Sequence, residues 1–170
     1  MKYRDTKTGA SRAQVQLRFA KRAAKAISTM QCLVVSADRR RGEMLQRAAT
    51  EGGWKTCICV DAATALTHVS RSFVQLAVVD LERQLWSDFR PVLELLTSQS
   101  GVLLVVCGNE GNVEEELWVR QHGAWLYLPG VEETNNLALL CGEARQIVER
   151  LARAAPTPSL APTVEQGTYS

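Results

Sequence analysis

The sequence predicts an α/β domain built on a parallel sheet of five strands, and three observations lead to this fold class. Residues 76–79 are four consecutive apolar residues without alternation, the pattern of a strand buried on both faces. Similar short apolar runs recur along the chain and alternate with segments of helical spacing. The 170 residues are enough for one domain with a sizeable core and too few for two.

The expected elements alternate between strand and helix along residues 30–153. Gly52 and Gly53 end the first helix, and Pro91 fits the first turn of the third. Asp61 is expected to cap the second helix. The predicted strands are 32–35, 54–60, 76–80, 102–106 and 124–128, and the predicted helices run to about 51 and over about 62–72, 89–98, 113–122 and 132–153.

Five strand–helix units joined by right-handed crossovers allow few topologies. The commonest at this length is the flavodoxin-like order 2-1-3-4-5, which leaves the fifth strand at an edge. We therefore predict a (βα)5 domain over residues 30–153, preceded by a basic N-terminal helix. Residues 154–170, which contain several Pro, Thr and Ser residues, are expected to form a disordered tail.

Asp80 is the first candidate for a functional residue. It follows the apolar residues 76–79, and open α/β sheets place their chemistry at the carboxyl ends of the strands. The alternative is that Asp80 only ends the strand and caps the next turn.

The net charge of +2 conceals an uneven distribution. Residues 1–29 carry eight basic residues and one acidic residue, a net charge of +7, so the remainder carries −5. Basic residues surround a narrow apolar stripe in a helix expected over about 11–28. This basic N-terminal arm predicts binding to nucleic acid, an acidic partner or an anionic membrane surface; the alternative is a solvated helix.

The cysteines and the hydropathy pattern indicate a soluble, cytoplasmic protein. Five cysteines, an odd number, lie mostly in apolar runs, as expected of reduced thiols packed as small hydrophobes. With two histidines and no second cysteine pair, no zinc site is predicted. No apolar run approaches the ~20 residues that span a bilayer, and no secretory signal is evident.

The sequence resembles the receiver domain of bacterial response regulators, and the likeness extends over the whole (βα)5 region. The residues that carry it lie at the third and fifth predicted strands. Asp80 falls where that family carries its phosphoaccepting aspartate. Gly123-Ala124 and Tyr127-Leu128-Pro129 resemble the family's Gly-Ala, Tyr-Leu and Lys-Pro stretch, with Tyr127 at the aromatic switch position. The resemblance implies a receiver-type fold and a part in two-component signal transduction, or phosphorelay.

The sequence departs from the family where the family's chemistry resides. Ser36 and Ala37 replace the acidic pair that would hold magnesium, and Asp38 lies one residue later. Cys107 stands in place of the Ser or Thr that binds the phosphoryl group. The lysine expected before the fifth-strand proline has no counterpart beside Pro129.

These departures predict that Asp80 is vestigial. Phosphoryl transfer to a carboxylate needs a divalent ion and a cation that neutralises charge on the phosphoryl oxygens. Asp80 alone would offer magnesium too few oxygen ligands. Without the lysine, no fixed positive charge would face an acyl phosphate on Asp80. We therefore expect no catalytic residue, metal or cofactor.

Three functions fit the sequence. The preferred one is a degenerate, stand-alone receiver-like adaptor (a pseudo-receiver), not an enzyme, that acts by protein–protein interaction; the 17 residues after Arg153 leave no room for an output domain. The second is a conventional phosphoreceiver, in which Asp80 accepts phosphate from a histidine kinase and Asp38 helps to hold magnesium. The third is a flavodoxin-like ligand-binding module.

Two details weaken the ligand-binding and nucleophile hypotheses. The loop 36–42 has one glycine and three arginines, instead of a glycine-rich phosphate loop. Its arginines either grip an anion near a helix N-terminus or are solvated. A thiol nucleophile at Cys107 would lack a base.

Three aromatic residues mark the candidate interaction surface. The fourth helix, fifth strand and fifth helix form the usual signalling surface of receivers, and here they carry Trp118, Trp125 and Tyr127. Trp125 and Tyr127 are two apart, so they are expected to share one face of the strand. If exposed, these rings would anchor a protein partner or a homodimer; the alternative is that they pack beneath the helices.

Overall fold

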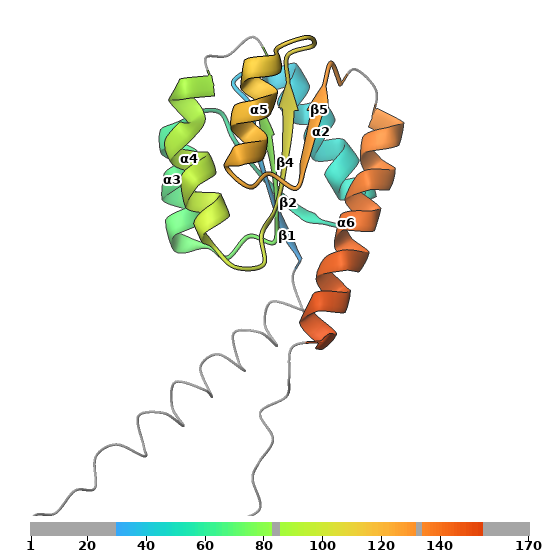
Figure 1. Ribbon diagram of the computed structural model, residues 1–170. Coiled ribbons are helices and arrows are strands. Elements are labelled where there is room, and N and C mark those ends of the chain that lie inside the picture. Colours follow the sequence, from blue (N-terminus) through green and yellow to red (C-terminus); the bar gives the residue numbers. More distant parts are fainter. Residues whose placement is uncertain (1–29, 83–85, 132–133, 155–170) are drawn as a thin grey trace, which may run out of the picture.

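The computed structural model describes residues 30–82, 86–131 and 134–154, and it has the predicted sheet (Figure 1). Five parallel strands lie in the order β2-β1-β3-β4-β5. The predicted basic helix over 11–28 and nearly all of the predicted tail lie outside the described residues. Among those that are described, no helix is both long and apolar enough to cross a membrane.

Strands and helices alternate as expected, with small shifts in their bounds. The strands are β1 (Gln31–Val35), β2 (Lys55–Cys59), β3 (Leu76–Asp80), β4 (Leu103–Gly108) and β5 (Leu126–Pro129). The helices are α2 (Arg39–Glu51), α3 (Ala62–Arg71), α4 (Trp86–Ser98), α5 (Val113–Gln121) and α6 (Thr134–Ala154).

The sheet is covered on both faces, which explains the apolar runs without alternation (Figure 1). In β3, Ala77 and Val79 pack in a core cluster with α3, α4 and α5. Leu76 and Val78 point to the opposite face and pack in a second cluster with α2 and α6. Every residue of β3, including Asp80, is buried.

Two local predictions are wrong. Helix α4 begins at Trp86 instead of about residue 89, so Pro91 lies inside the helix rather than in its first turn. Tyr127 and Trp125 do not share a face, because Trp125 precedes β5 and packs with the cluster beneath α2 and α6. Tyr127 belongs to the opposite cluster.

Side-chain caps fix where three helices begin, α2 at Asp38, α3 at Asp61 and α5 at Asn112, and the sequence predicted the cap at Asp61. Asp61 caps α3, as expected, by accepting a hydrogen bond from the backbone N–H of Thr64 at 2.7 Å. This bond lowers the pKa of Asp61. Asp38 caps α2, so its carboxylate has a structural task at the edge where the candidate site lies.

Candidate functional site

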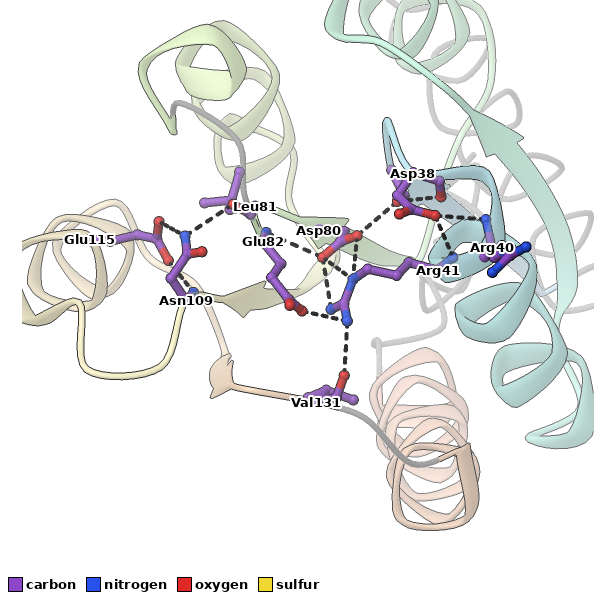
Figure 2. A network of polar contacts seen from close by, with 10 residues as sticks. Asp38, Arg40, Arg41, Asp80, Leu81, Glu82, Asn109, Glu115 and Val131 are labelled. Carbon is purple, nitrogen blue, oxygen red and sulfur yellow. Dashed lines mark hydrogen bonds and ion pairs between the residues drawn. The ribbon is translucent and has the colours of Figure 1, made fainter.

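The carboxyl ends of the strands meet at one edge, and Asp80 lies at the centre of that edge (Figure 2). Asp80 is the last residue of β3, where it pairs in register with Cys107 of β4. It is only 1% exposed. A carboxylate so deeply buried requires partners for its charge.

Both carboxylate oxygens of Asp80 are already bonded within the chain. Oδ2 accepts hydrogen bonds from Ser36 Oγ at 2.7 Å and from Arg41 Nε at 3.0 Å. Oδ1 accepts from Arg41 Nη2 at 3.0 Å and, less closely, from Arg41 Nε at 3.2 Å and the Glu82 N–H at 3.3 Å. The Arg41 guanidinium therefore forms a bidentate ion pair with the Asp80 carboxylate.

Arg41 also connects two loops at this edge. Its Nη1 pairs with Glu82, which lies two residues after the end of β3. The same nitrogen donates a hydrogen bond to the carbonyl of Val131, after β5, at 3.1 Å (Figure 2). Burial opposes the charge of Arg41, but the hydrogen bonds and charge of Asp80, with the charge of Glu82, raise its pKa above the ordinary value. A fixed positive charge thus sits against Asp80, contrary to our expectation from the missing lysine.

The first turn of α2 explains why one arginine of the run turns inward. Asp38 accepts hydrogen bonds from the backbone N–H groups of Arg40 and Arg41, at 2.8 and 3.1 Å, so the helix begins at Arg39. Arg39 and Arg40 are exposed, and Arg39 pairs with Glu43 on the surface. Of these three arginines, only Arg41 faces the sheet. The alternative that the arginines are solvated therefore holds for Arg39 and Arg40 but not for Arg41.

The other predicted pocket residues, Ala37, Asp38 and Cys107, differ in exposure and in what they contact. Asp38 and Ala37 are exposed, and the Asp38 carboxylate is aimed at the helix N-terminus. Cys107 is fully buried, and burial together with the charge of Asp80 raises the pKa of its thiol to about 12. Cys107 therefore stays protonated near neutral pH and is no thiolate nucleophile.

Magnesium, which the conventional phosphoreceiver hypothesis requires, does not fit this arrangement. Among the described residues, no three His, Cys, Asp or Glu side chains gather in a group that could hold a metal ion. The Asp80 and Glu82 carboxylates both pair with Arg41. The guanidinium holds the space that a cation would need.

A second polar cluster, which the sequence did not predict, surrounds Glu115 of α5. Glu115 is 0% exposed. Its carboxylate accepts hydrogen bonds from the Asn109 N–H at 2.9 Å, the Asn109 side chain at 2.9 Å and the Tyr127 hydroxyl at 2.8 Å. The Asn109 side chain also donates to the Leu81 carbonyl at 3.2 Å, beside Asp80 (Figure 2). The two polar clusters are therefore neighbours along one edge.

Gly108 shows how closely this second cluster is packed. A Cβ placed on Gly108 would lie 2.3 Å from Glu115 Oε1 and from two atoms of the Tyr127 ring and hydroxyl. Burial and the hydrogen bond to Glu115 raise the pKa of the Tyr127 phenol. Tyr127 is buried at 5% exposure, so it packs beneath the helices and is not an exposed anchor.

The other aromatic residues of the candidate surface are partly buried. Trp118 of α5 packs against Trp86 of α4, with ring centroids 4.6 Å apart, and against His122 at 4.3 Å. Trp125 packs at the opposite face of the sheet. The most exposed apolar side chains of α5 are instead Val113, at 73%, and Leu117, at 57%.

Comparison with known proteins relates this architecture to solved structures. No protein-family model matches the chain, and no curated protein matches it in sequence. A CheY-like response regulator receiver domain from Methanospirillum hungatei matches with a TM-score of 0.63 and 17% identity, over 72% of this chain and 98% of that one. This chain has the receiver-domain fold.

Two further solved structures share the fold at similarly low identity. The receiver domain of NtrX from Brucella abortus has a TM-score of 0.58 and 21% identity, over 68% of this chain and 98% of that chain. The signal receiver domain of an HD domain-containing protein from Pseudomonas fluorescens has a TM-score of 0.62 and 15% identity, over 72% of this chain and 98% of that chain. Any functional conclusion must therefore come from the site itself.

Proposed function

We propose that this protein is a receiver-fold signalling adaptor that binds a protein partner without phosphorylation of Asp80. The observation that carries the proposal is the Arg41–Asp80 ion pair. Both Asp80 oxygens accept hydrogen bonds from the guanidinium, and Ser36 donates a third strong one at 2.7 Å. The domain is then a binding module, with no enzymatic activity of its own.

The ion pair disfavours phosphotransfer for a physical reason. A carboxylate attacks phosphorus through a lone pair of one oxygen, and the attack needs a divalent ion on the phosphoryl oxygens. Freeing Asp80 means separating a charge pair at a site where Asp80 is 1% exposed, and breaking such a pair costs about 3–5 kcal/mol. Among the described residues at this edge, the Asp38 carboxylate bonds the N-terminus of α2 and the Glu82 carboxylate pairs with Arg41.

The proposal is tested with magnesium and beryllofluoride, a mimic of the phosphoryl group. Trp86 begins the helix that follows Asp80, so its fluorescence serves as the reporter. We expect no magnesium-dependent change in the wild-type protein. A change that Asp80→Asn abolishes would contradict the proposal and favour a conventional phosphoreceiver served by a histidine kinase.

The partner surface that we propose lies on α5, at the edge of the sheet that β5 forms. Val113 and Leu117 are four residues apart and exposed, so they lie on one face of the helix. A second copy of this chain is the partner that is simplest to test, by sedimentation of the wild type beside Leu117→Ser. Loss of association in the variant supports this surface, whereas a monomeric wild type would exclude the homodimer.

A further inference from the structure

We propose that the basic N-terminal arm, residues 1–29, docks in a groove between α2 and α6 of its own chain. This α2–α6 groove is lined by Glu51 and Gly52 at the end of α2 and by residues of α6 between Ala138 and Gln146. Helices α2 and α6 cover one face of the sheet and α5 covers the other (Figure 1). The inference therefore goes beyond the proposed function, which concerns Asp80 and the surface of α5.

The α2–α6 groove, with a volume of about 540 Å³, depends on two glycines. Gly52 lets the end of α2 approach α6 closely, since a Cβ there would lie 2.6 Å from the Cβ of Cys141. A Cβ on Gly142 would instead meet no atom of another described segment within 4 Å. Glycine inside a helix costs about 0.5–1 kcal/mol relative to alanine. The space that Gly142 leaves beside α6 suits a side chain from a further segment.

The lining of the groove is acidic and apolar. Glu51 and Glu143 are exposed, and Leu139 is 72% exposed. Among the described residues that line the groove, none is Lys or Arg. Arg145, on the same helix, donates to the Gly53 carbonyl and pairs with Glu149 at 3.1 Å, outside this lining. A basic segment with an apolar side therefore complements the groove.

The sequence of the arm has both properties. Its net charge is +7, and it carries apolar residues four positions apart, which share one side of a helix: Val15, Phe19, Ala23 and Ile27. Basic residues flank this stripe: Arg12, Arg18, Lys21, Arg22 and Lys25. The helix expected over 11–28 would be about 27 Å long, whereas the part of α6 that lines the groove spans about 12 Å. The stripe fits the apolar lining, and the basic residues fit Glu51 and Glu143.

The arm joins the domain near the groove. Met30, the first described residue, is buried in the core cluster beneath α2 and α6. Its carbonyl accepts a hydrogen bond from the Lys55 N–H at 2.9 Å. The neighbouring Trp54 donates its indole N–H to the carbonyl of Cys141 on α6 at 2.8 Å. The chain thus enters the sheet on the side where the groove lies, so a short path connects the two.

The experiment measures trypsin cleavage of the arm in the full chain, because the arm contains eight Lys and Arg residues. Mass spectrometry gives the rate at each site, and a synthetic peptide of residues 1–29 serves as the unprotected reference. We expect cleavage in the wild type to be at least about tenfold slower than in the peptide, since trypsin cuts only the undocked arm. High salt should reduce this protection, because it screens the contacts with the two glutamates.

Two groove variants and one control locate the protection. Glu51→Gln/Glu143→Gln removes the acidic charge, and Gly142→Gln fills the space beside α6; neither adds a trypsin site. Both should bring the cleavage rate close to that of the peptide. Glu94→Gln/Glu114→Gln makes the same change in charge on α4 and α5, at the other face of the sheet, and should keep the protection of the wild type. Glutamine favours a helix more than glycine does, so Gly142→Gln should stay folded, as circular dichroism would check.

Three results would overturn the inference. The first is a wild-type arm that is cleaved as fast as the peptide, and the second is protection that the folded Gly142→Gln variant retains in full. The third is protection that rises with protein concentration, because the arm would then bind a second copy instead of its own chain. Each would leave the proposed function intact, since the beryllofluoride experiment tests that function separately.

Discussion

Two buried carboxylates lie along one edge of the sheet, and the chain stabilises them in different ways. Asp80 is held by a cation, since the Arg41 guanidinium spans both of its oxygens. Glu115 is held by neutral donors, namely the backbone and side chain of Asn109 and the Tyr127 hydroxyl. Both side chains are almost completely excluded from water.

The difference shows which carboxylate depends on a charged partner. Ser36 and the Glu82 N–H are neutral donors to Asp80, so the loss of Arg41 removes the positive charge that faces this buried carboxylate. The stabilisation of Glu115 is divided among three donors, and each is a modest contribution.

The largest effect is expected from Arg41→Ala. We expect it to lower the free energy of unfolding by about 3–5 kcal/mol in metal-free buffer, because Asp80 is left buried without a cation. Urea unfolding followed by tryptophan fluorescence measures this. The double variant Arg41→Met/Asp80→Leu should recover much of the loss, since it replaces both charges by apolar groups. An equal loss in the double variant would mean that packing, not charge, sets the cost.

A smaller effect is expected from Glu115→Leu. The substitution removes the acceptor of three hydrogen bonds, from the Asn109 N–H, the Asn109 side chain and the Tyr127 hydroxyl, so stability should fall by about 1–3 kcal/mol. Glu115→Gln keeps one oxygen acceptor and should cost less. A loss as large as that of Arg41→Ala would contradict the contrast between the two clusters.

Tyr127→Phe tests how far the donors of Glu115 share its stabilisation. It removes one of three hydrogen bonds and keeps the ring in place, so a loss of about 1 kcal/mol is expected. Thermal unfolding by calorimetry, read at the wild-type midpoint, measures the difference. A loss as large as that of Glu115→Leu would show that Tyr127 dominates the cluster.

The smallest effect concerns the cap that sets up the Arg41 geometry. Asp38→Ala removes the acceptor for the Arg40 and Arg41 N–H groups and should cost about 1 kcal/mol. Asp38→Asn keeps an oxygen acceptor and should be close to the wild type. If Asp38→Asn instead costs as much as Asp38→Ala, the carboxylate has a role beyond capping.

The fold and the position of Asp80 could be predicted from the sequence because both follow from local patterns. The apolar run 76–79 indicates a strand buried on both faces, and Asp61 marks a helix start. The sequence could not show which arginine of the run meets Asp80. The Asp38 cap fixes where α2 begins, and this start turns Arg41 inward and leaves Arg39 and Arg40 exposed.

Glu115 was missed for a similar reason. It lies within a run of three glutamates, 114–116, that is typical of a solvated first turn of a helix. Its burial depends on the close approach of Gly108 and on the inward position of Tyr127, both of which are tertiary features. A small residue at the end of β4 was the only sequence signal, and it is too common to interpret alone.

The central claim, that Arg41 keeps Asp80 from acting as a phosphoacceptor, is tested most directly by intact-protein mass spectrometry. The wild-type chain is incubated with acetyl phosphate and Mg²⁺, beside Asp80→Asn as the control. We predict that neither protein gains the mass of a phosphoryl group. A phosphoryl adduct on the wild type that is absent from Asp80→Asn would contradict the account.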